Sequence, residues 1–137
     1  MPTITTPRPP LNLFNVARVV IPSFYTTVLE TPDYLIPAVG PNPERTIEAV
    51  ALLTSLMVTN NATETLQLSA RIVDADGVEF LILNRMDIPP NDFAVIELGK
   101  QNLRSGERLD LKTENFQGAI ANLSYVLNQR EEYTVIT

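Results

Sequence analysis

Hydrophobic and polar residues alternate along much of the chain, most clearly in the segment TLQLSARIV at residues 65–73. Its even-numbered positions are apolar and its odd-numbered positions are mainly polar, which is the period of two expected of a half-buried β-strand. The pattern therefore predicts one face of this strand in the core, carried by Leu66, Leu68, Ala70 and Ile72.

A second strand-like segment, VEFLILN at residues 78–84, follows almost directly. The residues between the two segments include the pair Asp76-Gly77. An Asp-Gly pair favours a tight hairpin turn because glycine reaches positive φ without a Cβ clash. The sequence therefore predicts a β-hairpin with Gly77 at a positive φ.

Turn signals recur about every ten residues through the rest of this half of the chain. Pro89-Pro90 precedes the apolar segment FAVIEL at 93–98, Ser105-Gly106 precedes RLDLKTE at 108–114, and GAIANLSYVLN follows at 118–128. The residues expected on the buried faces of the last two are Leu109, Leu111, Ala121, Leu123, Tyr125 and Leu127. This spacing predicts an all-β protein, an antiparallel β-sandwich that is jelly-roll-like or Ig-like.

One segment, NPERTIEAVALLTSLMVTNN at residues 42–61, fits two structures. Asn42 and Pro43 could begin a helix as its N-cap and first residue, and apolar residues recur at helical spacing from Ile47 onward. A central strand covered on both faces would give the same nearly continuous apolar run. We favour a strand because the segments after it are strand-like and Asn60-Asn61 supplies a turn.

Proline divides the chain unequally, because nine of the eleven prolines lie in the first 43 residues. Proline cannot donate a ladder hydrogen bond, and it restrains the preceding residue to extended conformations. We therefore predict an extended Pro-rich N-terminal arm at residues 1–43, which makes assembly contacts, and a β-sandwich body at residues 44–137.

The predicted arm is too apolar to be a solvated tail. Proline also lowers the entropy that an extended segment loses when it docks onto another surface. We expect five residues of the arm to lie at contacts between chains: Leu11, Leu13, Phe14, Phe24 and Tyr25.

Composition narrows the classes of function. The net charge is −6 with ten cations, and phosphate contacts from Lys and Arg dominate nucleic-acid affinity, so nucleic acid is not an expected partner. No apolar run is long enough for a membrane span. Cysteine is absent, which excludes disulfides and suits a reducing cytoplasm, and the absence of histidine removes the commonest general base and metal ligand.

The segment from Asp74 to Gly77 resembles the start of a calcium loop, which needs an acidic ligand at its twelfth position. That position holds the cation Arg85, so we interpret the segment as a turn only. No other motif indicates catalysis or a bound group. We expect no enzyme activity, no catalytic residue, no metal and no cofactor.

Five segments carry a family resemblance: LMVTN, RIVDADGVEFLIL, DIPPNDFAVIELG, LRSGERLDLKT and GAIANLSYVLNQREEYTVI. Their order resembles that of small virion structural proteins of tailed bacteriophages, particularly those that infect cyanobacteria. The shared plan is a strand ending in Val-Thr-Asn, an Asp-Gly hairpin, a Pro-Pro turn, a Ser-Gly turn and a last strand containing Ser124-Tyr125. The resemblance covers about Leu56 to Thr137, and the arm has no part in it.

The resemblance implies a non-enzymatic virion structural protein that is assembled in the bacterial host cytoplasm as a homo-oligomer. Its expected partners are copies of itself and other virion proteins of the capsid, neck or tail. Within this class we favour a capsid decoration or cement protein. The alternative is a structural component of the neck or tail, such as a collar, connector or fibre-anchoring protein.

A rival from a different class is a carbohydrate-binding β-sandwich module. Such modules present exposed aromatic side chains, above all tryptophan, that stack on sugar rings. The chain has no tryptophan, and most of its phenylalanines and tyrosines lie in apolar stretches. We therefore place this reading behind both virion readings.

Overall fold

The computed structural model describes residues 3–5, 13–38, 40–99, 101–114 and 119–134, and the regular structure of these ranges consists of strands. In chain order the strands are β1 (Thr3–Thr5), β2 (Leu13–Ile21), β3 (Thr26–Glu30), β4 (Asp33–Ile36), β5 (Arg45–Asn60), β6 (Leu66–Val73), β7 (Glu79–Ile88), β8 (Asp92–Glu97), β9 (Asn102–Arg104), β10 (Arg108–Thr113) and β11 (Ala119–Thr134). The predicted all-β class is confirmed.

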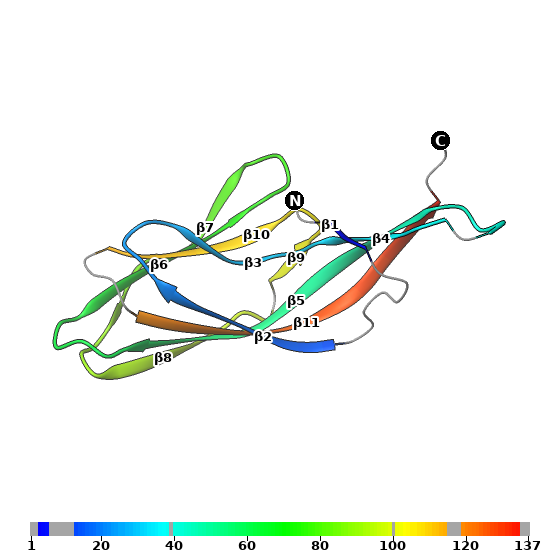
Figure 1. Ribbon diagram of the computed structural model, residues 1–137. Helices are drawn as coiled ribbons and strands as arrows, with labels where there is room; N and C mark the ends of the chain where they lie inside the picture. The colour runs from blue at the N-terminus through cyan, green and yellow to red at the C-terminus, as the bar shows by residue number, and fades with distance from the viewer. Residues whose placement is uncertain (1–2, 6–12, 39, 100, 115–118, 135–137) are drawn as a thin grey trace.

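The strands form two sheets that pack face to face, as Figure 1 shows edge-on. The large sheet has the order β1-β4-β5-β11-β2, with β8 and β9 also paired to β5, and the small sheet has the order β3-β10-β6-β7. All pairs are antiparallel except β1 with β4. The predicted antiparallel β-sandwich is confirmed.

The core between the sheets is made of aliphatic side chains from both layers. All four residues expected from the period of two in β6 are buried, and so are the two leucines of β10. In β11, Ala121 and Leu123 are fully buried, Leu127 is nearly so, and Tyr125 packs against the core while half-buried. The alternation in the sequence therefore identified the inner faces of these three strands correctly.

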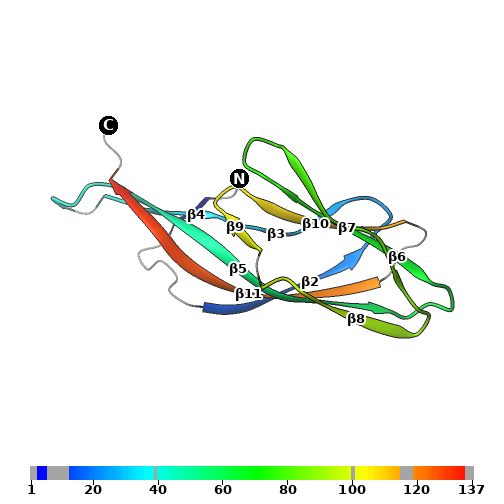
Figure 2. The same cartoon turned by 180° about the vertical axis from the view of Figure 1, so that it is seen from behind.

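The ambiguous segment is the strand β5, so the preferred reading of residues 42–61 is confirmed. One side of β5 pairs with β11 along nearly its whole length, and the other side pairs in turn with β4, β9 and β8 (Figure 2). A bulge interrupts the ladder with β11 at Thr54, whose hydroxyl donates to the carbonyl of Ser124 at 2.8 Å.

The bulge explains why this strand resembled a helix in sequence. Before it, the inward residues are odd-numbered, from Ile47 to Leu53; after it they are even-numbered, from Leu56 to Asn60. An extra residue in one strand shifts the alternation by one position. The shift imitates the spacing of three to four residues that belongs to an amphipathic helix.

The predicted division at residue 43 does not separate an arm from the sandwich. Strands β2, β3 and β4 pair with β11, β10 and β5, so residues 13–36 supply strands to both sheets. The links between them are bonded as well: the amide of Thr113 donates to the carbonyl of Pro22, and the amide of Gly106 donates to that of Thr31. Prolines 22, 32 and 37 lie in the links between strands and not inside them, so they leave the ladders intact.

The predicted hairpin joins β6 to β7, and Gly77 has a φ of +86°, as expected. The amide of Gly77 donates to the carbonyl of Asp74 at 3.0 Å. The Oδ1 atom of Asp74 accepts the amides of Asp76 and Val78, both at 2.9 Å. This aspartate is therefore a structural part of the turn.

Candidate functional site

The outer face of the large sheet, which points away from the small sheet, carries apolar side chains on four neighbouring strands. We call this surface the apolar face. It consists of Phe14, Val16 and Val20 on β2, Ile120 and Val126 on β11, Leu52 and Met57 on β5, and Phe93 and Val95 on β8.

The sequence of β2 shows how such a face arises. Ala17, Val19 and Ile21 point inward and pack against or within the core. The even-numbered residues of the strand point to the opposite side because side chains alternate along a strand, and three of these, Phe14, Val16 and Val20, are again apolar. The strand is thus apolar on both sides, although the small sheet covers only one.

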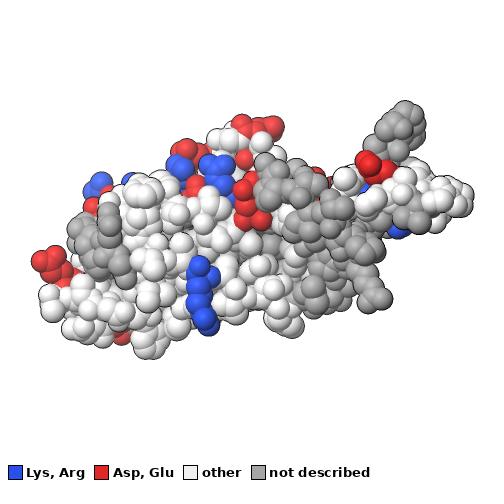
Figure 3. Space-filling model, in the orientation of Figure 1, with Lys and Arg blue, Asp and Glu red and all other residues white. Residues whose placement is uncertain are grey.

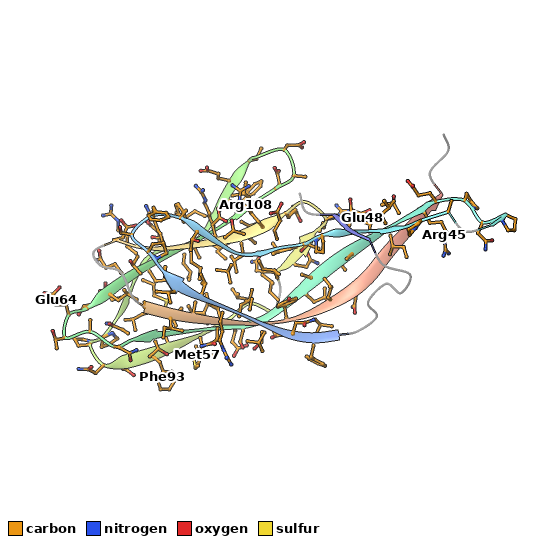
Figure 4. All side chains as sticks on the ribbon, viewed as in Figure 1. Arg45, Glu48, Met57, Glu64, Phe93 and Arg108 are labelled. Carbon is orange, nitrogen blue, oxygen red and sulfur yellow. The ribbon has the colours of Figure 1, made fainter. Side chains whose placement is uncertain are left out.

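Val126 is half-buried, and the other side chains of the apolar face are exposed, with Phe14 at 83% and Phe93 at 58% of their full accessible surface. Figure 4 shows Met57 and Phe93 on the side of the large sheet that points away from the small sheet. In Figure 3 the surface over β2 is mostly uncharged and crossed by one cationic side chain, whereas charged side chains gather over β6, β7 and β10. The two sides of the sandwich therefore differ in chemistry.

The outer side of the small sheet is organised by charge. The carboxylate of Asp110 is almost fully buried there and accepts hydrogen bonds from Arg71 Nε at 3.1 Å and Thr27 Oγ1 at 2.9 Å. Arg71 also contacts Glu79 at 2.9 Å. These bonds link β3, β10, β6 and the start of β7, and they satisfy the charges within the chain.

Neighbouring polar groups continue this arrangement. The ring of Tyr25 lies beneath the guanidinium of Arg71, 3.9 Å from ring centre to carbon, and Lys112 lies 4.8 Å from the same centre. A hydrogen bond from Ser69 to the carboxylate of Glu114 holds the pKa of that carboxyl below its ordinary value. The outer side of the small sheet is thus a network of partnered charges.

The structure separates the five arm residues expected at contacts between chains. Phe14 belongs to the apolar face, and Phe24 is 64% exposed in the link between β2 and β3. Tyr25 is half-buried beneath Arg71. Leu11 lies outside the described residues, and Leu13 pairs with Leu127 through its backbone, while its side chain lies outside the described part. Whether these residues contact another chain stays a prediction.

Most of the apolar face was not identified from the sequence, because six of its nine residues come from β5, β8 and β11. A signal was present in segments such as VALLTSLMV and FAVIEL, where apolar residues occupy both parities of the strand. In the segment 42–61 such a run was interpreted as a strand covered on both sides. The structure shows that one side of it is open.

Two depressions lie elsewhere on the surface. A groove of about 490 Å³ follows the open edge of the sandwich between β7 and β8, and Ile82, Leu83, Ile96 and Leu98 form its apolar lining. A shallower one of about 270 Å³ lies between the turn at residues 74–76 and the β9–β10 turn, and its acids include Glu48 and Glu107.

The acids of the second depression are largely used by the backbone. Asp74 holds its own turn, and Glu107 Oε1 accepts the amide of Arg104 at 2.7 Å. In the ranges that the structure describes, no three acidic, histidine or cysteine side chains gather closely enough to hold a metal ion. Over the same ranges, no helix has the length and apolar character needed to cross a membrane.

The fold and the apolar face together define a β-sandwich protein with a broad exposed apolar surface. No family model matches the chain, and no curated protein matches it. Among solved structures, the chain is similar to the CBM22-1–GH10 modules of the endo-1,4-β-D-xylanase 10B of Clostridium thermocellum, solved with xylohexaose. The identity is 12%, the TM-score is 0.34, and the match covers 89% of this chain and 27% of the other.

The chain is also similar to structures of infectious bursal disease virus. For the Gx strain the identity is 12% and the TM-score 0.32, with 90% of this chain and 37% of the other covered. For the Gt strain the values are 11% and 0.32, with 92% and 38% covered. The chain therefore spans about a quarter to two fifths of these proteins, and likenesses this low carry no argument about activity or partners.

Proposed function

We propose that this chain is a non-enzymatic structural subunit of a bacteriophage particle, and that within the particle it decorates the capsid. The observation that carries the proposal is the apolar face. The largest continuous apolar patch of a soluble protein is often a functional contact site, because leaving it in water costs about 25 cal/mol per Å². A subunit that works by contact with neighbouring proteins needs such a face.

The sequence resemblance supports the phage assignment. The segments that carry it lie in the end of β5 and in β6, β7, β8, β9, β10 and β11, so the resemblance concerns strands of both sheets. The charge distribution supports a role in an assembly, because the mostly uncharged side can dock onto a neighbouring subunit, a copy of the chain included, while the charged side remains in water. A place in the neck or tail is the alternative within this proposal.

The proposal is tested by asking whether the protein binds particles that lack it. Phe93→Lys places a charge on the apolar face, whereas Phe80→Lys changes a similarly exposed phenylalanine, 53% against 58%, on the other sheet. We expect wild type and the Phe80 variant to co-sediment with particles and the Phe93 variant to lose binding. Equal binding of all three proteins would show that the apolar face is not the contact surface.

Copy number separates the two locations within the particle. Quantitative mass spectrometry of purified particles should find hundreds of copies if the protein decorates the capsid. A small multiple of a ring symmetry would place it in the neck or tail, because these structures are built as closed rings. Its absence from purified particles would overturn the proposed function itself.

A further inference from the structure

The pairing register places the outward residues of the large sheet in rows that cross four strands. One row runs Val20–Ile120–Thr59–Phe93, the next Arg18–Asn122–Met57–Val95, and the third Val16–Ser124–Ser55–Glu97, from β2 through β11 and β5 to β8. Paired residues of neighbouring strands point to the same side of a sheet. These twelve positions therefore form one continuous surface.

Only two of the twelve positions are charged, and these two lie at opposite edges of the surface. Arg18 lies on β2 at one edge of the surface, and Glu97 lies on β8 at the opposite edge, one row away. Arg18 Nε donates to Oδ1 of Asn122 at 2.6 Å, which directs the arginine side chain over the neighbouring strand. The surface thus has a positive edge, an apolar and neutral centre, and a negative edge.

We propose that this face binds the same face of a second copy of the chain, as a two-fold dimer. A two-fold axis along the strands, between β11 and β5, would lay β2 of each copy over β8 of the other. Phe93 would then lie opposite the partner's Val20. Arg18 would lie one row from the partner's Glu97, a spacing of about 7 Å that an arginine side chain spans.

Charge complementarity is the reason for choosing a second copy as the occupant. Opposite charges at opposite edges are what a self-complementary face requires, because the two-fold operation brings each edge onto the other. Each dimer would contain the Arg18–Glu97 contact twice.

The face supplies about half of the surface that a stable dimer buries on each partner. Four strands about 4.8 Å apart, over the seven residues from Phe14 to Val20, cover on the order of 400 Å² in projection. That lies within the range of roughly 300–600 Å² for the largest apolar patch of a monomer. The projected area of the face, without its rim, is about half of the roughly 800 Å² that each partner buries in a stable interface.

This inference rests on the proposed function only for the premise that the face is a contact surface, and it is tested without particles. Analytical ultracentrifugation of the purified full-length chain over a concentration series should show a reversible monomer–dimer equilibrium. We expect Arg18→Glu alone and Glu97→Arg alone to weaken the dimer by about tenfold or more, because each change places two like-charge contacts in one interface.

The decisive variant carries both changes, Arg18→Glu with Glu97→Arg. It exchanges the charges and restores both contacts, so its dissociation constant should return to within a few fold of the wild-type value. Arg85→Glu, on β7 in the other sheet, is the matched control and should leave the dimer unchanged. Circular dichroism of each variant checks that the sandwich is folded, and both charged sites are exposed, so folding should be retained.

Three results would overturn the inference: a wild-type chain that is monomeric throughout, single variants as dimeric as wild type, or a double variant that fails to recover. A monomeric chain whose Phe93→Lys variant loses particle binding would reject the dimer and leave the proposed function standing. If the protein forms a dimer with the expected charge dependence but is absent from purified particles, the dimer stands and the proposed function is rejected.

Discussion

The Nε atom of Arg71 lies 3.1 Å from Oδ2 of Asp110, and this carboxylate is almost fully buried on the outer side of the small sheet. The pair joins β6 to β10 at paired positions of the ladder. Because Tyr25 stacks beneath the same guanidinium, the pair also fixes the link that leads into β3. A single charge contact thus holds three segments that are far apart in the sequence.

Asp110→Ala should lower the free energy of unfolding by about 2 to 4 kcal/mol, because removal of one partner leaves a partly buried cation without its main counter-charge. Arg71 keeps its contact with Glu79, which places the expected loss below that for an isolated buried charge. Urea denaturation measures the change. The control Arg108→Gln removes a more exposed cation 3.3 Å from the same carboxylate and should cost about 1 kcal/mol or less.

Asn60→Ala should destabilise the protein by about 2 to 4 kcal/mol, because it leaves buried carbonyl groups without donors. The Nδ2 atom of Asn60 lies 2.8 Å from the carbonyl oxygen of Glu64 and 3.0 Å from that of Ile88, and Oδ1 accepts the amide of Ala62 at 3.0 Å. The exposed neighbour offers a matched control, Asn61→Ala, for which we expect a change within about 0.5 kcal/mol. Equal losses for the two variants would contradict this role.

Gly77→Ala should cost about 1 kcal/mol or more in thermal or urea unfolding, since an L-residue is strained at a φ of +86°. Space is not the obstacle, because a Cβ at this position would meet no atom within 4 Å. Gly99 is equally open but does not adopt a positive φ, so Gly99→Ala isolates the backbone effect. Equal stabilities of the Gly77→Ala and Gly99→Ala variants would contradict the assignment of Gly77 to a turn position that requires a positive φ.

Alkaline pH should destabilise the wild type more than a Tyr125→Phe variant. Burial raises the pKa of the Tyr125 phenol above its ordinary value of 10.0, so the folded state favours the neutral form. The contribution is fully present below the pKa of the unfolded chain and is lost as the pH rises through the folded pKa. Melting temperatures measured from about pH 9 to 11 should therefore diverge, and parallel curves would contradict the prediction.

The sequence was sufficient to predict the sandwich, because the inner faces of β6, β10 and β11 alternate strictly and each turn has its own residue chemistry. Gly77 could be assigned a positive φ because the Asp-Gly pair demands it. Strand β5 was harder to assign. The bulge at Thr54 changes the buried residues from odd-numbered to even-numbered positions. No local feature of the sequence predicts this bulge.

The course of the N-terminal residues and the apolar face could not be predicted in the same way. The nine prolines in the first 43 residues suggested one extended arm, whereas Pro22, Pro32 and Pro37 lie outside β2, β3 and β4 and leave these strands intact. Which side of a doubly apolar strand faces the core depends on its register with strands about a hundred residues away, as for Val16 and Ser124. A local sequence pattern does not specify the pairing of strands that are far apart in the sequence.

The position of β11 between β5 and β2 has a consequence for how the protein is made. This strand follows all the others in the sequence, yet it occupies an interior position of the large sheet. At about 5–20 residues per second, the roughly one hundred residues that separate β2 from β11 take on the order of 5–20 s to be synthesised. Until β11 has left the ribosome, β2 lacks its neighbour in the large sheet and its apolar residues stay uncovered. We therefore expect the nascent chain to need protection by chaperones during that interval, and the large sheet to close only when its last strand arrives.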